Sequence, residues 1–285
     1  MTDKYIQTNR KNGVLTITLD DPTSRNAIRP EMVIELLEEF DRFDSTHSDK
    51  VLLLTGNDPS FCSGANIRVF NRAIEERANS GDQSTTLPWG AMEHQLGYKK
   101  DHSHAQGSLS GSVLPLRIQE IQKPTIAAIN GHAMGLGLGI ALSCDIRLAS
   151  ENARLSETFS RMGLIPGDGS CWQLPRLIGL SHTFLLQYTG DALDASEAYR
   201  IGLVSKIYPH GELMNEAQAL AKRIASGATY AMSLTKYLVN KSLSLEMNES
   251  MNLAHSAQEL ARQSHDHKEA VQAFLEKRTP TFKGY

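Results

Sequence analysis

The sequence predicts an α/β fold whose strands pair in parallel, and two observations lead to it. Short apolar runs with the composition of buried strands lie at 50–55, 125–130 and 145–149, and helix patterns lie at 30–43 and 135–143. Two of these segments also end in small-residue turns, Ser63-Gly64-Ala65 and 134–139. Alternation of strand and helix places consecutive strands in parallel with right-handed crossovers, so we expect one α/β core.

The N-terminal elements are predicted by turn and helix-start signals. Residues 5–9 and 14–19 form a predicted β-hairpin, because Asn12-Gly13 is a strong turn signal and the second run alternates apolar residues with Thr. A helix is predicted from Pro30 to Phe43, since proline and an early acid favour the first turn and apolar residues follow at helical spacing.

The C-terminal part is predicted to be mostly helical. A short helix at 195–201 and a last strand at 203–208 precede helix patterns at 212–226, 231–241, 245–263 and 267–277. We therefore expect a core over 1–205 and a C-terminal helical region over 206–285. The apolar stripe of Leu253, Leu260 and Ala261 is too extensive for one core to cover, which predicts an oligomerisation region.

Composition excludes several classes of function. The chain has 285 residues and a net charge of −3, which gives no basic field for nucleic acid or an anionic membrane. No apolar run approaches the ~20 residues that span a bilayer, and the polar N-terminus carries no signal-peptide pattern. The three cysteines, Cys62, Cys144 and Cys171, lack metal-ligand spacing and are typical of reduced thiols in a cytoplasmic protein.

The stretch 77–113 is longer than the loops of compact α/β domains. It is either a surface insertion or a lid over a substrate pocket. In the second case an apolar wall would come from Trp89, Met92, His94, Leu96 and Tyr98.

An ordered set of motifs then points to a family. The segments are Asn26-Ala27, 61–68, 123–139, Asp145, 163–167, 174–179, 198–204 and 274–278. Together they resemble the enoyl-CoA hydratase/isomerase (crotonase) superfamily over nearly the whole chain. The resemblance implies a ββα superhelix of stacked sheets with crossover helices, followed by C-terminal helices. It also implies an acyl-CoA thioester as substrate and backbone N–H groups of Ala65 and Leu136 that stabilise an enolate oxyanion.

The resemblance leaves the reaction open. The two positions that hold glutamates in hydratases of the family are Gly139 and Phe159 here. Water addition needs a positioned acid and base, so the usual hydratase mechanism lacks its groups. Asp168 and Glu157 are substitute candidates. Alternatively, Asp168 is a helix N-cap and Glu157 is an exposed strand residue.

Three functions remain compatible with the sequence: a family enzyme of the lyase or isomerase type, an acyl-CoA double-bond isomerase that uses Asp168 or Glu157, and a silent acyl-CoA-binding protein. The resemblance implies coenzyme A as part of the substrate, no permanently bound cofactor, no metal, and a homotrimer or dimer of trimers. Expected CoA contacts are Arg25, Ala27, Ser63, Ala65, Asn66, Ile67, Arg68 and Lys277.

Overall fold

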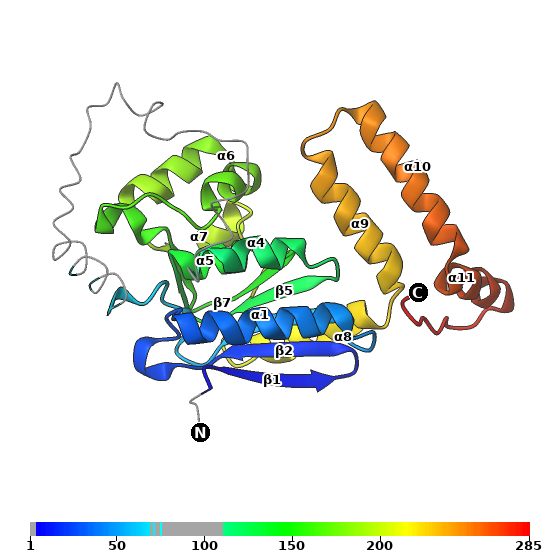
Figure 1. The fold of residues 1–285 in the computed structure, drawn as a ribbon, viewed down its shortest axis with the longest axis horizontal. Helices are drawn as coiled ribbons and strands as arrows, with labels where there is room; N and C mark the ends of the chain where they lie inside the picture. The colour runs from blue at the N-terminus through cyan, green and yellow to red at the C-terminus, as the bar shows by residue number, and fades with distance from the viewer. Residues whose placement is uncertain (1–3, 69–70, 72–74, 76–110) are drawn as a thin grey trace.

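A computed structural model describes residues 4–68, 71, 75 and 111–285 and contains two stacked sheets with helices around them (Figure 1). The first sheet has the strand order β1-β2-β3-β5-β7-β10. Its strands are β1 (Ile6–Lys11), β2 (Val14–Leu19), β3 (Val51–Gly56), β5 (Thr125–Ile129), β7 (Ile146–Ser150) and β10 (Lys206–Tyr208). Only β1 and β2 pair antiparallel in this sheet, so the predicted parallel α/β class is confirmed.

The second sheet has the order β4-β6-β8-β9 and consists of very short strands. These are β4 (Ser60–Cys62), β6 (His132–Met134), β8 (Arg154–Ser156) and β9 (Leu193–Asp194). Successive strands alternate between the two sheets before a helix follows, as in β5-β6-α5 and β7-β8-α6. The ββα superhelix that the resemblance implied is therefore confirmed.

The Asn12-Gly13 turn forms as the sequence predicts. Both residues have positive φ angles, 54° and 77°, as a two-residue hairpin loop between twisted strands requires. Lys11 pairs with Val14 directly across this loop, which fixes the register of the hairpin. The predicted strand at 203–208 is shorter and begins at Lys206. The N–H of Leu203 instead bonds the carbonyl of Ala198, 2.8 Å away, and closes α7 (Ala195–Arg200).

The core divides at the first sheet because side chains alternate between its two faces. Leu15, Ile17 and Leu52 face the larger cluster, which includes α1 (Pro30–Ser45) and α4 (Val113–Glu120). Val51 and Leu53 face the smaller cluster against α8 (Leu213–Ala225). The sheet is therefore buried on both faces, which holds the carboxyl ends of its strands in fixed positions.

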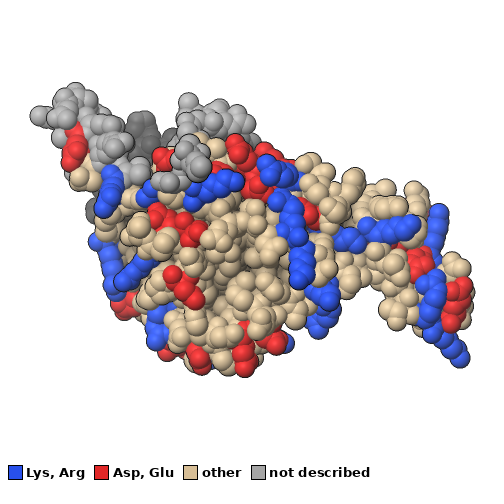
Figure 2. All heavy atoms as spheres, turned by 90° about the horizontal axis from the view of Figure 1, so that it is seen from below, with Lys and Arg blue, Asp and Glu red and all other residues tan. Residues whose placement is uncertain are grey.

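The remaining helices divide between the body and an arm. α5 (Leu136–Leu142) and α6 (Ser170–Thr189) pack on each other within the body. α9 (Thr229–Ser242), α10 (Met247–Gln263) and α11 (His265–Glu276) project to one side of it (Figure 1). Helix α8 belongs to the predicted C-terminal region but packs on the first sheet. On the face in Figure 2, Lys and Arg are interspersed with Asp and Glu.

Candidate active site

The first glycine turn leaves the N–H of Ala65 without a hydrogen-bond partner in the described part of the chain. Ala65 forms a parallel bridge with Ile28. In this bridge Gly64 accepts from the N–H of Ile28 at 2.8 Å, and Asn66 donates to the carbonyl of Ile28 at 2.9 Å. The bridge therefore uses the groups on either side of Ala65, and its own N–H points to the other side of the segment.

The second glycine turn directs the N–H of Leu136 into the same region. Gly135 has a φ of 49° and joins β6 to α5, which begins at Leu136. The N–H of Gly135 bonds the carbonyl of Ser156 at 2.8 Å, so strand β8 anchors the turn. Leu136 is the first residue of its helix, and the first four N–H groups of a helix have no partner within it.

The two turns are in direct contact. A Cβ atom at Gly64 would lie 2.9 Å from the carbonyl oxygen of Met134 and 3.9 Å from the nitrogen of Leu136. A Cβ atom at Gly137 would overlap Cys62, whose own Cβ is 2.8 Å away. Glycine is thus required where the turns meet, and this contact brings the segments of Ala65 and Leu136 together.

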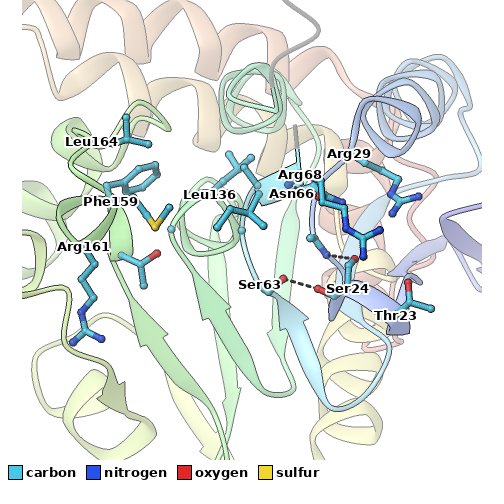
Figure 3. A pocket seen from close by; sticks show the side chains of 17 residues that line it. Thr23, Ser24, Arg29, Ser63, Asn66, Arg68, Leu136, Phe159, Arg161 and Leu164 are labelled. Atoms are coloured by element: carbon cyan, nitrogen blue, oxygen red, sulfur yellow. Dashed lines mark hydrogen bonds between the residues drawn. The ribbon is translucent and has the colours of Figure 1, made fainter. Parts of the chain in front are cut away.

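A cavity of about 690 Å³ opens over these turns (Figure 3). Leu136 lies near its middle, Arg29 and Arg68 lie toward one end, and Phe159 and Leu164 lie toward the other (Figure 3). The cavity therefore offers two guanidinium groups at one end, and apolar side chains together with the guanidinium of Arg161 at the other. Six of the expected CoA contacts line it, namely Ala27, Ser63, Ala65, Asn66, Ile67 and Arg68.

Arg29 is a lining residue that the sequence interpretation missed. Its guanidinium pairs with Asp21 at 3.0 Å and lies 4.4 Å from the ring centre of Tyr5. Ser24 also lines the cavity, and its carbonyl accepts from the hydroxyl of Ser63 at 2.8 Å. Arg29 directly precedes Pro30 at the start of α1, and this place beside the Asn26-Ala27 motif was the available signal.

Two expected CoA contacts do not line this cavity. Arg25 ends a short 3-10 helix, Pro22–Ser24, in a left-handed conformation with φ 55°, and its carbonyl accepts from the N–H of Ser63 at 3.0 Å. Lys277 ends helix α11 in the arm. The structure uses the backbone of Arg25 near the first turn and places Lys277 at the end of a different element.

Asp168, Glu157 and Ser170 form a buried cluster beside α5. The hydroxyl oxygen of Ser170 lies 2.7 Å from Oδ1 of Asp168 and 3.1 Å from Oε2 of Glu157. Oδ1 of Asp168 also accepts the N–H of Ser170, the first residue of α6, at 3.1 Å. Oδ2 of Asp168 and Oε1 of Glu157 have no hydrogen-bond partner among the described residues. Ser170 was not foreseen, although Asp-x-Ser at a helix start is a recurring turn pattern.

Burial controls the protonation of this cluster. Burial, together with the nearby charge of Asp168, raises the pKa of Glu157 to about 9, while Ser170 opposes the shift. Burial also raises the pKa of Asp168 above its ordinary value, and two hydrogen bonds from Ser170 oppose that shift. Two adjacent carboxylates with raised pKa values are typical of proton-transfer sites.

The structure corrects two sequence expectations about these acids. Glu157 is fully buried and precedes a 3-10 helix, Thr158–Met162, so the hypothesis of an exposed strand residue is wrong. Phe159 lies within that same helix. The capping hypothesis for Asp168 is partly confirmed: the N-cap position is Gly169, but Asp168 accepts the first N–H of α6.

The two positions that hold glutamates in the hydratases are Phe159 and Gly139 here, and the structure shows the surroundings of each. Phe159 lines the cavity. A Cβ atom at Gly139 would overlap Oδ2 of Asp168 and lie 2.7 Å from its Cγ. The carboxyl group of Asp168 therefore occupies the space that a side chain at 139 would need.

Other sequence candidates fall outside or away from this site. Trp89, Met92, His94, Leu96 and Tyr98 lie outside the described residues. Among the described residues, no group of three His, Cys, Asp or Glu side chains is arranged to hold a metal. Cys62 and Cys144 are buried free thiols and Cys171 is an exposed one. No helix of the described part is long and apolar enough to cross a membrane.

Comparison with known proteins identifies the family to which the chain belongs. The family model for enoyl-CoA hydratase/isomerase matches residues 9–92 and 91–285. The chain is 30% identical to 1,2-epoxyphenylacetyl-CoA isomerase of Escherichia coli, over 99% of each chain. It is 31% identical to crotonyl-CoA hydratase of Syntrophomonas wolfei, over 96% of this chain and 95% of that protein.

Solved structures agree with the sequence relatives. The crystal structure of enoyl-CoA hydratase from Bacillus anthracis superposes with a TM-score of 0.81 at 29% identity, over 99% of this chain and 100% of that one. The matches cover both the two-sheet body and the C-terminal helices. The chain thus belongs to the enoyl-CoA hydratase/isomerase family of enzymes, the crotonase superfamily.

Proposed function

We propose that this enzyme binds an acyl-CoA thioester and stabilises an enolate of that thioester through the N–H groups of Ala65 and Leu136. The observation that supports this most directly is the contact between the two glycine turns, where both N–H groups lack a partner in the described chain. An oxygen that gains negative charge is stabilised best by donors that are fixed before the reaction. Each such donor contributes ~2.7–4 kcal/mol to transition-state stabilisation.

The shape of the cavity supports a CoA ester as the ligand. Arg29 and Arg68 provide guanidinium groups for phosphate at one end, and Phe159 provides an apolar surface at the other. We infer that Ala27, Ser63, Ala65, Asn66, Ile67 and Arg68 hold the CoA moiety, while Arg25 contributes through its backbone. Contact between Lys277 and the CoA of a neighbouring subunit stays a prediction of the family resemblance.

The proton transfer that we propose is of the isomerase type, with Asp168 as the first candidate and Glu157 as the second. Gly139 and Phe159 are not ionisable, so they cannot activate water as the two hydratase glutamates do. Asp168 instead places a carboxyl group against Gly139. The similarity to an isomerase that acts on a CoA ester agrees with this choice.

The proposal is tested with Asp168→Asn. We expect the variant to lose isomerisation of a short enoyl-CoA by at least about 100-fold, the usual contribution of a general base. Its affinity for the acyl-CoA should stay close to that of the parent protein, because only the transition state is affected. Assays of enoyl-CoA hydration and isomerisation are run beside a titration of acyl-CoA binding, and thermal unfolding checks that the variant folds.

The outcomes separate the alternatives. Hydration of the enoyl-CoA that survives Asp168→Asn would contradict the isomerase mechanism. Binding of acyl-CoA without turnover by the parent protein would support the silent binding protein instead. A cytoplasmic location and a homotrimer or dimer of trimers stay predictions of the family resemblance.

A further inference from the structure

The hydrogen bonds around Ser170 determine where the protons of the buried cluster lie. A hydroxyl group has one proton to donate and two lone pairs that accept. Oδ1 of Asp168 lies closer to this hydroxyl, at 2.7 Å, than Oε2 of Glu157, at 3.1 Å. Oδ1 also receives the N–H of Ser170, so this oxygen is already in the environment of an ionised carboxylate. The hydroxyl proton of Ser170 is therefore assigned to Asp168.

The contact between the hydroxyl oxygen of Ser170 and Oε2 of Glu157 then needs a proton that Ser170 does not supply. Two oxygens 3.1 Å apart with no proton between them would repel each other. Since the hydroxyl proton is already used, Glu157 must supply one, which makes it a neutral carboxylic acid. The second lone pair of Ser170 faces Nε2 of Gln187 at 3.5 Å.

Burial leads to the same distribution of charge. Glu157 is fully buried and Asp168 is nearly so, and both carboxyl groups contact one hydroxyl. Two negative charges this close in a buried site cannot both persist, so one group keeps its proton. Glu157 is the one with fewer donors, because Asp168 receives two hydrogen bonds from Ser170.

Access to substrate also differs between the two acids. Asp168 lines a cavity of about 140 Å³ together with Leu116 of α4 and Trp172 of α6. Its unpartnered Oδ2 packs against Gly139 and fills the space that a side chain there would need. Glu157 lines neither this cavity nor the 690 Å³ cavity over the glycine turns. Asp168 does not line the 690 Å³ cavity over the glycine turns, but it is the member of the cluster that borders a cavity.

We propose that Glu157 and Asp168 form a carboxyl pair bridged by the hydroxyl of Ser170, in which Glu157 holds one proton and Asp168 is the base, while Glu157 and Ser170 are positioning residues. Glu157 donates to Ser170, and Ser170 donates to Asp168, which polarises the chain toward the charged end. The inference rests on the proposed function and specifies which of the two acids contacts the substrate.

The proton balance of the reaction is closed within this pair. When the C–H bond next to the thioester breaks, its proton goes to Oδ2 of Asp168 and its electron pair forms the enolate. Asp168 then returns that proton to the carbon at the far end of the enolate. Glu157 keeps its own proton throughout, so the pair alternates between one negative charge and none.

The arginines of the surrounding elements contact partners outside the carboxyl pair. Arg161, beside Glu157 in the chain, pairs with Asp191 at 2.7 Å. Arg117 of α4 pairs with Asp41 and Asp44. Arg176 of α6 lies over the ring of Trp172, 4.1 Å from its centre. α4 also carries Glu120, α6 also carries His182, and α5 carries no charged residue.

Cys171 is a titratable neighbour of the pair on α6. It follows Ser170, and burial together with the charges of Asp168 and Glu157 raises the pKa of its thiol. Cys171→Ser therefore serves as the control in every pH experiment below.

The first test needs no turnover. Infrared difference spectra of the parent protein and Glu157→Gln should show one protonated carboxyl group at neutral pH that disappears as the pH passes about 9. In Asp168→Asn the same band should disappear at a lower pH, because the neighbouring charge is gone. If the band is missing at neutral pH, the proton on Glu157 is refuted, whether or not the protein turns over enoyl-CoA. If the band is present but no enoyl-CoA reacts, the proposed function fails alone.

The second test uses the pH profile of kcat. Ser170→Ala removes a donor from Asp168, so the acid limb should move up by about one to two pH units. Ser170→Thr keeps the hydroxyl and should restore the parent profile. Glu157→Gln should lose the alkaline limb near pH 9, whereas Cys171→Ser should keep it. An unmoved acid limb in Ser170→Ala, or an alkaline limb that survives in Glu157→Gln, would overturn the positioning roles.

Discussion

Gly139 and Asp168 constrain each other at the level of single atoms. The carboxyl group of Asp168 fills the space beside Gly139, and even a Cβ atom there would lie 2.7 Å from Cγ and 2.8 Å from Cβ of Asp168. The absence of a side chain at 139 and the presence of an acid at 168 are thus one structural feature. A chain with a glutamate at 139 could not hold Asp168 in this position.

The raised pKa of Glu157 predicts how stability depends on pH. Burial raises the pKa of folded Glu157 to about 9, while the unfolded residue has the ordinary glutamate pKa of about 4.5. Between these values unfolding releases a proton, so stability falls as pH rises, by ~1.4 kcal/mol per pH unit for a full proton. Glu157→Gln removes this cost. Chemical denaturation should show the variant gaining stability over the parent protein from about pH 5 to pH 9.

A matched variant controls for the loss of one charge. Glu38→Gln removes an exposed carboxyl group from α1, far from the cluster in the sequence. A stability difference that grows with pH for Glu157→Gln but not for Glu38→Gln supports the buried proton. Equal pH dependence of the two variants would contradict it.

The two glycine turns show how short elements position the site. β4 and β6 are three residues each, yet they hold Gly64 and Gly135 against each other through parallel pairing and the contact with Met134. The turns are thereby fixed before any substrate arrives. Pre-positioned donors need no reorganisation when charge develops, which is the property that the proposed oxyanion site requires.

Gly64→Ala tests this arrangement. Its φ of 102° and the 2.9 Å approach of its Cβ to the carbonyl of Met134 should force the turns apart. We expect kcat to fall by at least about 100-fold, which corresponds to the loss of one oxyanion donor. Gly202→Ala is the matched control, because its φ is also positive at 83° but its Cβ would meet nothing closer than 3.8 Å.

Comparing the two variants separates the cost of backbone strain from the effect of losing the contact between the two turns. Both should lose about 1–3 kcal/mol of stability, the usual cost of a side chain in this backbone region. Only Gly64→Ala should lose kcat. Equal activity of the two variants would show that the contact between the turns does not position the donors.

The whole molecule exposes apolar surface on its arm. Phe274 is 83% exposed and Leu275 is 74% exposed, and Leu260 of the predicted stripe is half exposed. The C-terminal tail is tied back to the arm, since the N–H groups of Lys283 and Gly284 bond the carboxylate of Asp266 at 2.7 and 2.8 Å. The tail therefore does not cover these side chains in the single chain, and a neighbouring copy is the expected cover.

Assembly is predicted to depend on this surface. Light scattering at micromolar concentration should give a homotrimer or a dimer of trimers. Phe274→Asp should shift it toward monomer, because it loses the ~1.5–3 kcal/mol that burial of a large apolar side chain contributes at each interface. Gln272→Asp places the same charge on the same helix as a control. A parent protein that is only monomeric would contradict the predicted oligomerisation region.

Much of the fold follows from local patterns that the sequence carries. The hairpin at Asn12-Gly13, the helix that begins at Pro30 and the long C-terminal helices all form where turn chemistry and periodicity predict them. The second sheet was not predicted, because strands of two or three residues are too short to show alternation. Its existence was implied only by the resemblance to a family.

By itself the sequence determined the α/β class, the two glycine turns and the absence of ionisable groups at 139 and 159. The tertiary structure alone decided the roles of the acids. Glu157 is buried and shares the hydroxyl of Ser170 with Asp168, and Asp168 packs against Gly139, 29 positions earlier in the chain. Such contacts arise from the packing of α5 against α6. Burial and proximity, which set the pKa of a carboxyl group, are properties of that packing and not of local sequence.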